Sequence, residues 1–253
     1  MATKKGKIIS VISMKGGVGK TILALNLAAI YADDKKKVLL VDMDLYGGAI
    51  ALNLNLQVEK TIYHFVDDLS NNRYQNFSDY VVPYSDQIDI LASPKDPRQA
   101  NKIASKYIEM ILANAIYRYD VILIDMTHSL NKNNINVLDM AYNILYVMTN
   151  DPMDLKNTKS FISILSDIEK DNVKIVLNDS LNLETVYFSN FDMKNIIKHK
   201  IDYTIPKSLH IKNITKYILD GKILYDNPLT SFKDRSSIKN LKNMAIDLLD
   251  ETK

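Results

Sequence analysis

One short run of the sequence, KGGVGKT at residues 15–21, restricts the possible folds more than any other. It follows a largely apolar stretch, Ile8–Ile12, and leads into an Ala- and Leu-rich stretch, Ile22–Tyr31. A strand, a glycine loop and a helix in this order form a cradle for phosphate. Glycines let several backbone N–H groups face one anion, and the helix N-terminus adds partial positive charge. We therefore expect an α/β fold that binds a nucleotide at this loop.

The composition indicates that the glycines of this run serve a particular backbone conformation, because the chain has only seven glycines and three of them lie here. An ordinary strand-to-helix turn is the alternative, and Met14 stands where the strict pattern has a glycine. Lys20 is expected to reach the β- and γ-phosphates, and Thr21 to place its hydroxyl on Mg²⁺. The nucleotide contacts predicted for the run are Gly16, Gly17, Val18, Gly19, Lys20, Thr21 and Ile22.

Two further apolar stretches end in carboxylates. Asp42 and Asp44 follow the stretch 38–41, and Asp125 follows the stretch 121–124. Ligands of open α/β sheets bind beyond the carboxyl ends of the strands, so these acids are predicted to lie beside the phosphate loop. There one aspartate of the pair can serve the Mg²⁺ shell while the other orients an attacking water. The predicted metal site is therefore Thr21, Asp42 and Asp125, and a surface aspartate pair that merely ends a strand is the alternative.

Two polar residues near strand ends are weaker candidates. Asn178 ends the apolar stretch 173–177, where its amide can read the adenine edge because it offers both a donor and an acceptor. An asparagine that simply stops a strand fits equally well. His128 lies just after Asp125, and a packing or surface role is favoured over contact with a substrate.

Short apolar runs alternate with helix-like segments along the chain. The predicted strands are 7–13, 38–42, 88–92, 121–125, 144–149, 173–177 and 201–205. The predicted helices are 20–31, 61–69, 98–117, 155–169, 208–219 and 236–249. This alternation indicates a single α/β domain, 1–253, with a mostly parallel twisted sheet of about seven or eight strands and helices on both faces. The polar stretch 71–84 is predicted to be a surface insertion.

The composition excludes several classes of site. Without cysteine, the chain can form neither a disulfide nor a cluster held by thiolates. No apolar run of about 18 residues and no signal peptide is visible, so we expect a cytoplasmic protein. The net charge of only +2 argues against a polycation.

The C-terminal part carries a local excess of positive charge. The stretch Lys194–Lys253 holds 12 Lys and Arg against 7 Asp and Glu. This excess could bind DNA phosphates, although a solvated helix face explains it as well. The last predicted helix has one apolar stripe, and its polar side mixes lysines with acids, which favours packing on the core over lying on a membrane. The stripe consists of Ile238, Leu241, Met244, Ala245, Leu248 and Leu249.

The loop has a second lysine, Lys15, ahead of its glycines, and in this it resembles the deviant Walker A motif of the ParA/MinD family of ATPases. The resemblance covers nearly the whole chain and implies a three-layer P-loop NTPase fold that binds ATP and Mg²⁺. It implies that Lys15 crosses a dimer interface to the partner's nucleotide and that Asp44 positions the hydrolytic water. The stretch ending in Asp125 has the form of a Walker B strand, and Pro206 resembles part of the family's adenine-side loop. The predicted catalytic residues are thus Lys15, Lys20 and Asp44.

Within this family, three segments look closest to the TadZ/CpaE branch of pilus-assembly localisation ATPases. They are VDMDLYGG at 41–48, ASPKDP at 92–97 and DMTHSLN at 125–131, the last being similar to that branch's Asp-Leu-Pro-His-Ser-Leu-Asn. The chain departs from the family pattern at three positions. Ile22 replaces a second Thr or Ser, Thr127 replaces a proline, and Asp179 replaces an arginine.

These features predict an ATP-dependent homodimer that acts as a positioning switch, with a pilus or secretion assembly apparatus as its cargo. Turnover is expected to be slow and stimulated by an unidentified partner protein, because part of the transition-state stabilisation would arrive with that partner. DNA partition through the basic C-terminal part and MinD-like division-site positioning are the alternatives, and direct membrane binding is disfavoured. A nucleotide-binding scaffold that does not hydrolyse ATP is the alternative from another class. Recruitment from the cytoplasm to a pole, the nucleoid or a membrane complex fits each positioning role.

Overall fold

The structure is a computed structural model that describes residues 5–181, 186–209, 220–226 and 235–250. Its centre is one eight-stranded sheet in the order β3-β4-β2-β5-β1-β6-β7-β8. All neighbouring strands are parallel except the antiparallel pair β3 and β4, which confirms the predicted α/β fold class with a mostly parallel sheet. The strands are β1 (Lys7–Ile12), β2 (Val38–Met43), β3 (Val82–Pro83), β4 (Ile88–Leu91), β5 (Val121–Met126), β6 (Asn143–Met148), β7 (Val173–Asn178) and β8 (Tyr203–Ile205).

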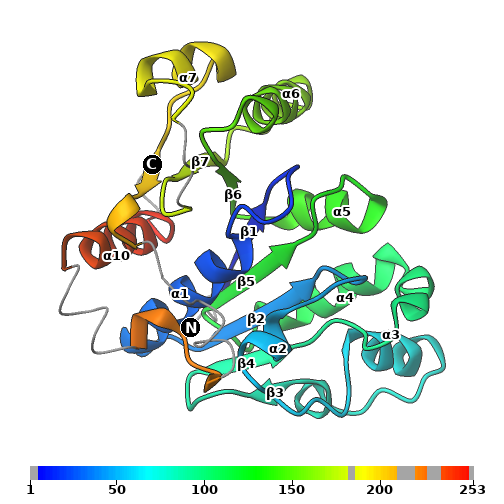
Figure 1. Ribbon diagram of the computed structural model, residues 1–253. Coiled ribbons are helices and arrows are strands. Elements are labelled where there is room, and N and C mark those ends of the chain that lie inside the picture. The colour runs from blue at the N-terminus through cyan, green and yellow to red at the C-terminus, as the bar shows by residue number, and fades with distance from the viewer. Residues whose placement is uncertain (1–4, 182–185, 210–219, 227–234, 251–253) are drawn as a thin grey trace.

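Helices cover both faces of this sheet (Figure 1). The α-helices are α1 (Lys20–Asp33), α2 (Ile50–Asn53), α3 (Ile62–Ser70), α4 (Ser105–Ala115), α5 (Lys132–Met140), α6 (Pro152–Asp167), α7 (Asn190–Ile197) and α10 (Arg235–Asp247). Short 3-10 helices are η1 (Phe77–Tyr80), η2 (Pro97–Lys102), η3 (Lys207–Leu209) and η4 (Leu224–Asp226).

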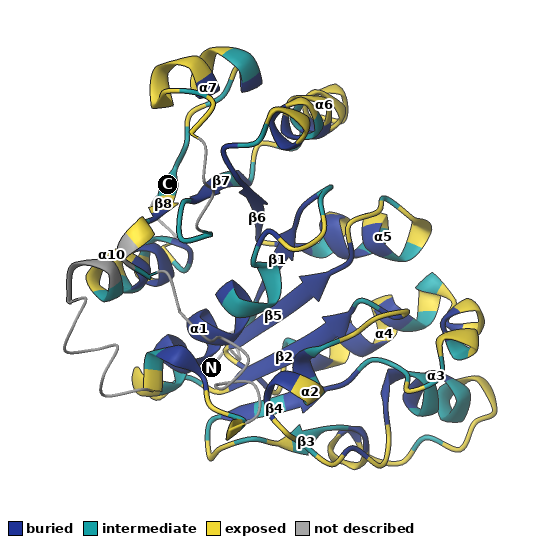
Figure 2. Cartoon of the chain, in the orientation of Figure 1, coloured by how far each residue is buried: buried dark blue, intermediate teal, exposed yellow. Residues whose placement is uncertain are grey.

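The central strands are buried on both faces, as the continuous apolar runs predict (Figure 2). Successive residues of β1 pack on opposite sides of the sheet, because side chains alternate along a strand. Ile9 and Val11 pack with α1 and α10, whereas Ile8 and Ile12 pack with the helices α3 to α7. The sheet thus separates two apolar layers, and its carboxyl edge is left to the loops.

The C-terminal helix α10 packs on α1, as its apolar stripe predicts. Leu241, Met244 and Leu248 are buried in the layer that contains α1. The buried Tyr31 hydroxyl of α1 donates a hydrogen bond to the Ala245 carbonyl at 2.9 Å. Within the described part of the chain, no helix is long and apolar enough to cross a membrane.

The prediction of a single helix at 98–117 is wrong, because the chain forms η2 and then α4 instead. Ile103 and Ala104 between them have extended backbone, with ψ of 96° and 141°. Ile103 is buried in the core, and an uninterrupted helix would lack the bend that lets both η2 and α4 bury their apolar sides.

The surface insertion predicted at 71–84 is also incorrect in part. Phe77 and Tyr80 on η1 are almost fully buried, and the Phe65 ring of α3 stacks on Tyr80 with centroids 4.3 Å apart. Tyr74 stacks on the same Phe65 ring at 5.3 Å. Most polar residues of this stretch face solvent, while Tyr74, Phe77 and Tyr80 complete the core beside α3.

Three α-helices, the short α2 and the longer α5 and α7, were not predicted from the sequence. The segment α5 has a weak apolar pattern, but the Asn131 side chain caps it by accepting from the Asn134 N–H at 2.9 Å. The helix α7 begins at a capping box in which the Ser189 hydroxyl accepts from the Asp192 N–H. Most of the helix predicted at 208–219 lies outside the described residues.

Candidate functional site

The phosphate loop connects β1 to α1, as its position in the sequence predicts. Gly17 and Gly19 have left-handed backbone, with φ of 74° and 96°. Other residues rarely adopt this conformation, which explains two of the three glycines. No side chain caps the start of α1 at Gly19, so the first N–H groups of the helix are left for an anion.

Lys20 stands at the first position of α1, among acidic side chains. Burial lowers the pKa of its ammonium group below the ordinary value, while the charges of Asp125, Asp44 and Asp154 act in the opposite direction. The loop therefore directs one desolvated cation toward the acids at the ends of β2 and β5. Such a cation is suited to pair with phosphate oxygens.

Asp125 and Thr21 form the closest contact of the candidate metal site. The Thr21 hydroxyl donates to Asp125 Oδ2 at 2.6 Å. Asp125 Oδ1 is buried and has no hydrogen-bond partner among the described residues, which is a costly arrangement for a carboxylate oxygen. Burial raises the pKa of Asp125 to about 6 against the opposing effects of Thr21 and Lys20. An unpaired carboxylate oxygen beside a hydroxyl of the phosphate loop fits the oxygen ligands of Mg²⁺.

This group lacks the ligands to hold an ion alone. No set of three His, Cys, Asp or Glu side chains is arranged as a metal site within the described ranges. Mg²⁺ commonly takes one or two carboxylates and fills its remaining positions with phosphate oxygens and water. Thr21 and Asp125 therefore fit a magnesium ion that arrives together with a nucleotide.

Asp42 lies directly beside Asp125, because the two residues are paired in the register of β2 and β5. Both of its oxygens are already engaged: Oδ1 accepts from the Asp44 N–H at 3.2 Å, and Oδ2 accepts from the Ile50 N–H at 3.1 Å. Burial, followed by the charge of Asp125, raises the pKa of Asp42 to about 7. Asp42 thus orients the loop that follows β2, in addition to its predicted place near the metal.

That loop also contains a close contact that sequence reasoning missed. A Cβ on Gly48 would stand 1.8 Å from Ser93 Oγ and 2.5 Å from Asp42 Oδ2, so only glycine fits between them. The Ser93 hydroxyl donates to Asp42 Oδ2 at 3.3 Å. The pair Gly47-Gly48 in a glycine-poor chain was the available signal. Asp44 itself is half-buried, and its Oδ1 accepts from the Gly47 N–H at 3.3 Å.

Lys15 pairs with an acid that follows β6. Its Nζ lies 3.1 Å from Asp151 Oδ1. Asp151 also caps α6, since its Oδ1 accepts from the N–H groups of Met153 and Asp154 at 3.0 Å each. Asp154 is fully buried; its Oδ2 accepts from Thr149, and its Oδ1 has no partner in the described part of the chain. Sequence reasoning missed both acids, although an Asp-Pro start to a helix is a recognisable signal.

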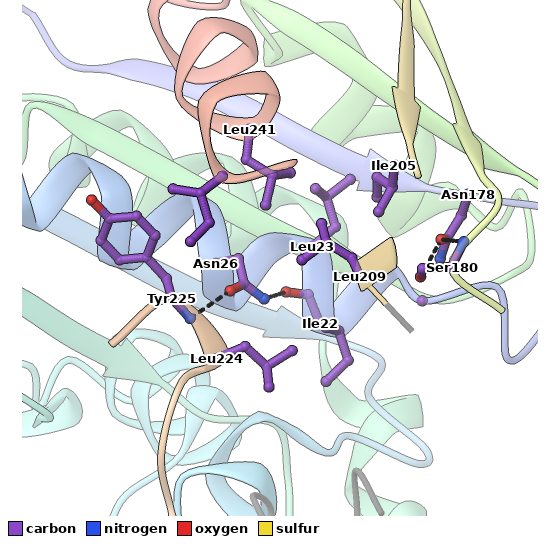
Figure 3. A pocket seen from close by; sticks show the side chains of 12 residues that line it. Ile22, Leu23, Asn26, Asn178, Ser180, Ile205, Leu209, Leu224, Tyr225 and Leu241 are labelled. Carbon is purple, nitrogen blue, oxygen red and sulfur yellow. Dashed lines mark hydrogen bonds between the residues drawn. The ribbon is translucent and has the colours of Figure 1, made fainter. Parts of the chain in front are cut away.

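An apolar pocket adjoins the loop on the side of β7 and β8 (Figure 3). Asn178 ends β7 in its wall, and Pro206 immediately follows β8. Pro206 itself does not line the pocket, but its neighbours Ile205 and Leu209 do. The structure therefore brings Ile22, Asn178 and the segment around Pro206 to one side of the loop. His128 lies exposed at the surface, as favoured from the sequence.

The basic C-terminal stretch is only partly covered by the described residues. Within them, Lys200 pairs with Asp202 at 3.1 Å and Lys242 pairs with Asp33 at 3.4 Å. These two lysines therefore balance acids of the chain itself.

Comparison with known proteins agrees with this geometry. A family model described as an AAA domain matches residues 6–183. An uncharacterized protein of Mycobacterium tuberculosis is 29% identical over 210 residues, which cover 77% of this chain and 61% of that protein. The chain thus spans about three fifths of the length of that relative.

Two further proteins are similar to this chain: a relative with a stated role, and a protein with a solved structure. The chromosome-partitioning ATPase Soj of Thermus thermophilus is 26% identical over 202 residues, covering 80% of this chain and 76% of Soj. The septum site-determining protein MinD of Pyrococcus horikoshii, solved in complex with Mg-ADP, superposes with a TM-score of 0.76 at 19% identity. That superposition covers 97% of this chain and 96% of the other, and it supports the fold assigned above.

Proposed function

The chain belongs to the ParA/MinD family of P-loop ATPases, and from this membership we propose that it is an ATP-dependent dimerising switch that positions a cellular cargo. One observation carries the proposal: the unpaired, buried Asp125 Oδ1 lies beside the Thr21 hydroxyl at the phosphate loop. A buried carboxylate oxygen without a partner is explained when a nucleotide brings Mg²⁺ to it.

Each residue of the loop has a part in binding the triphosphate. The backbone N–H groups from Gly16 to Thr21 would surround the phosphates, and Lys20 would pair with the β- and γ-phosphate oxygens. Thr21 and Asp125 would hold Mg²⁺, with Asp42 beside them. When bound, this ion neutralises charge that develops on the phosphate oxygens during transfer. Asn178 and Pro206 lie on the base side, where the apolar pocket adjoins the loop.

Asp44 is the residue proposed to act on the attacking water. Its carboxylate lies beyond β2, close enough to Lys20 to influence the pKa of that lysine, and it is half exposed. A carboxylate in this place can accept a hydrogen bond from a water that approaches the γ-phosphate. Slow turnover follows, because a lone subunit supplies only part of the positive charge that stabilises the transition state.

Lys15 supplies the remaining charge to a second copy. In a single subunit Lys15 Nζ pairs with Asp151, and the lysine side chain is 36% exposed. A partly exposed lysine at the start of the phosphate loop supports the proposal that Lys15 reaches the partner's phosphates. Two copies would then enclose two ATP molecules, and hydrolysis would release the pair.

The cargo is proposed at two levels. Soj, a chromosome-partitioning ATPase, supports a positioning function in general and DNA partition as one form of it. The TadZ/CpaE-like segment 125–131 supports a pilus or secretion apparatus as the cargo, and we retain it as the finer proposal. Steeply salt-dependent binding of duplex DNA would favour partition instead.

Sedimentation velocity of the Asp44→Ala protein with and without MgATP tests the switch. The variant should bind ATP, fail to hydrolyse it and shift from monomer to dimer when MgATP is added. Lys20→Ala should lose nucleotide binding and remain monomeric, while Lys15→Ala should bind ATP without dimerising. A protein whose oligomeric state ignores MgATP would reject the switch and favour a scaffold that does not hydrolyse ATP.

A further inference from the structure

The side chain of Asn178, at the end of β7, reaches the phosphate loop directly. Its Nδ2 donates a hydrogen bond to the Val18 carbonyl at 2.8 Å. Both residues are buried, with exposed fractions of 4% for Asn178 and 1% for Val18. A buried carbonyl depends on such a partner, because water cannot replace it there.

The neighbouring glycine shows how close this contact is. A Cβ on Gly19 would stand 2.5 Å from Asn178 Nδ2, so the amide fills the space where any larger residue would place its side chain. Sequence reasoning assigned Gly19 to the bend of the loop. The structure adds that Gly19 also makes room for Asn178.

The amide of Asn178 is oriented by a second set of contacts. Its Oδ1 accepts from the Ser180 N–H at 3.0 Å and from the Ser180 hydroxyl at 2.6 Å (Figure 3). A backbone N–H can only donate and the Val18 carbonyl can only accept, so the two ends of the amide cannot be exchanged. Both lone pairs of Oδ1 are used, and one N–H remains. The amide therefore cannot offer adenine the donor and acceptor pair that the sequence suggested.

The contact with Val18 sets the direction of a phosphate-binding group. The peptide between Val18 and Gly19 is trans and planar, so its C=O and N–H point in opposite directions. By holding the Val18 carbonyl toward β7, Asn178 turns the Gly19 N–H away from β7. Fixed N–H directions bind an anion without paying for reorganisation at the moment of binding.

We propose that Asn178 is a positioning residue for the phosphate loop, acting on phosphate through the Val18 carbonyl rather than by reading the base. The proposal rests on the nucleotide binding put forward above. It predicts that the residue matters equally for a nucleotide and for a phosphate chain that has no base.

Calorimetric titration with MgATP and with magnesium tripolyphosphate separates the two roles. Asn178→Ala should weaken both ligands by about tenfold, the effect of leaving one buried carbonyl unpaired. Ser180→Ala keeps the Val18 contact and removes one of the two bonds that Asn178 Oδ1 accepts from Ser180, so it should weaken both ligands by about two- to threefold. Loss of ATP affinity with unchanged tripolyphosphate affinity would overturn the proposal and restore the base-reading role.

Asn150 offers a matched control at the same edge of the sheet. It follows β6, is 5% exposed, and binds the Phe188 backbone with both ends of its amide, at 2.6 and 3.0 Å. Asn150→Ala should therefore destabilise the fold to a similar extent and leave both ligand affinities unchanged.

A second measurement needs no ligand. Backbone hydrogen exchange of residues 13–23 in the nucleotide-free protein should be faster in Asn178→Ala than in Asn150→Ala. Equal exchange in the two variants would overturn the proposal even if both fold. If the wild-type protein binds neither ligand while the two variants still differ in exchange, the proposed nucleotide binding is rejected. The role of Asn178 in holding the loop would then still stand.

Discussion

The ion pair between Lys15 and Asp151 makes a prediction about dimerisation. In the single subunit the two charged atoms lie 3.1 Å apart, so Lys15 must leave Asp151 before it can reach a partner's phosphate. Asp151→Asn removes this attraction. Asparagine caps helices as well as aspartate does, so the start of α6 should be preserved. The variant should therefore dimerise more tightly with MgATP than the wild type.

The size of the effect follows from the exposure of the pair. The side chains are 36% and 29% exposed, which places the pair among the partly screened ion pairs worth about 0.5–1 kcal/mol. That energy corresponds to a factor of about two to five in each subunit. Two subunits release their lysines when one dimer forms, so the dimer dissociation constant should fall by about 5- to 30-fold.

Sedimentation equilibrium measures this constant in an Asp44→Ala background, where hydrolysis should not interfere. Asp139→Asn is the control, because Asp139 pairs with Lys170 at 3.1 Å and that pair does not involve the nucleotide loop. The control should leave the constant unchanged. A dimer of Asp151→Asn that is no tighter than wild type would refute the idea that Asp151 retains Lys15.

Two further predictions concern stability. Asp42 and Asp125 have pKa values raised to about 7 and about 6, so the folded protein keeps protons that the unfolded chain has lost above about pH 4. Stability of the nucleotide-free protein should thus fall as pH rises from about 4 to 7 and then level off. Asp42→Asn should make this slope shallower in urea unfolding at about pH 5 and pH 7.5, and an unchanged slope would contradict the assignment. Leu248→Ala should cost about 2–5 kcal/mol, because this residue is 0% exposed on the layer beneath α10. Ile246→Ala, at a position 62% exposed, should change the urea midpoint little.

The strands and the loop were predictable because their signals are local. Apolar runs such as 121–124 mark strands buried on both faces, and a glycine cluster between a strand and a helix marks a phosphate loop. The elements that were predicted incorrectly depend on contacts with the rest of the fold. The break at Ile103 and the burial of Phe77 follow from core contacts with distant helices, which no local pattern encodes.

The functional residues also divide into those that local motifs reveal and those that depend on distant contacts. Lys20, Thr21, Asp42, Asp44 and Asp125 could be picked out from motifs, and the structure brings them to one edge of the sheet. The role of Asn178 could not be read correctly, since its partner Val18 is 160 positions away in the chain. Asp151 and Gly48 had local signals, but their contacts with Lys15 and with Ser93 could be found only in the folded structure.

The sequence by itself therefore determined the fold class, the phosphate loop and the acids that face it, because each depends on short runs of neighbouring residues. Only the tertiary structure decided which polar groups are paired and which are left unpaired. The sheet order β2-β5-β1-β6-β7 brings the residues that follow these strands together at one edge. There Asp125 Oδ1 has no partner among the described residues, Lys15 pairs with Asp151 and Asn178 binds the loop. The two contacts join residues far apart in the chain, and burial raises the energetic importance of Asp125 and Asn178.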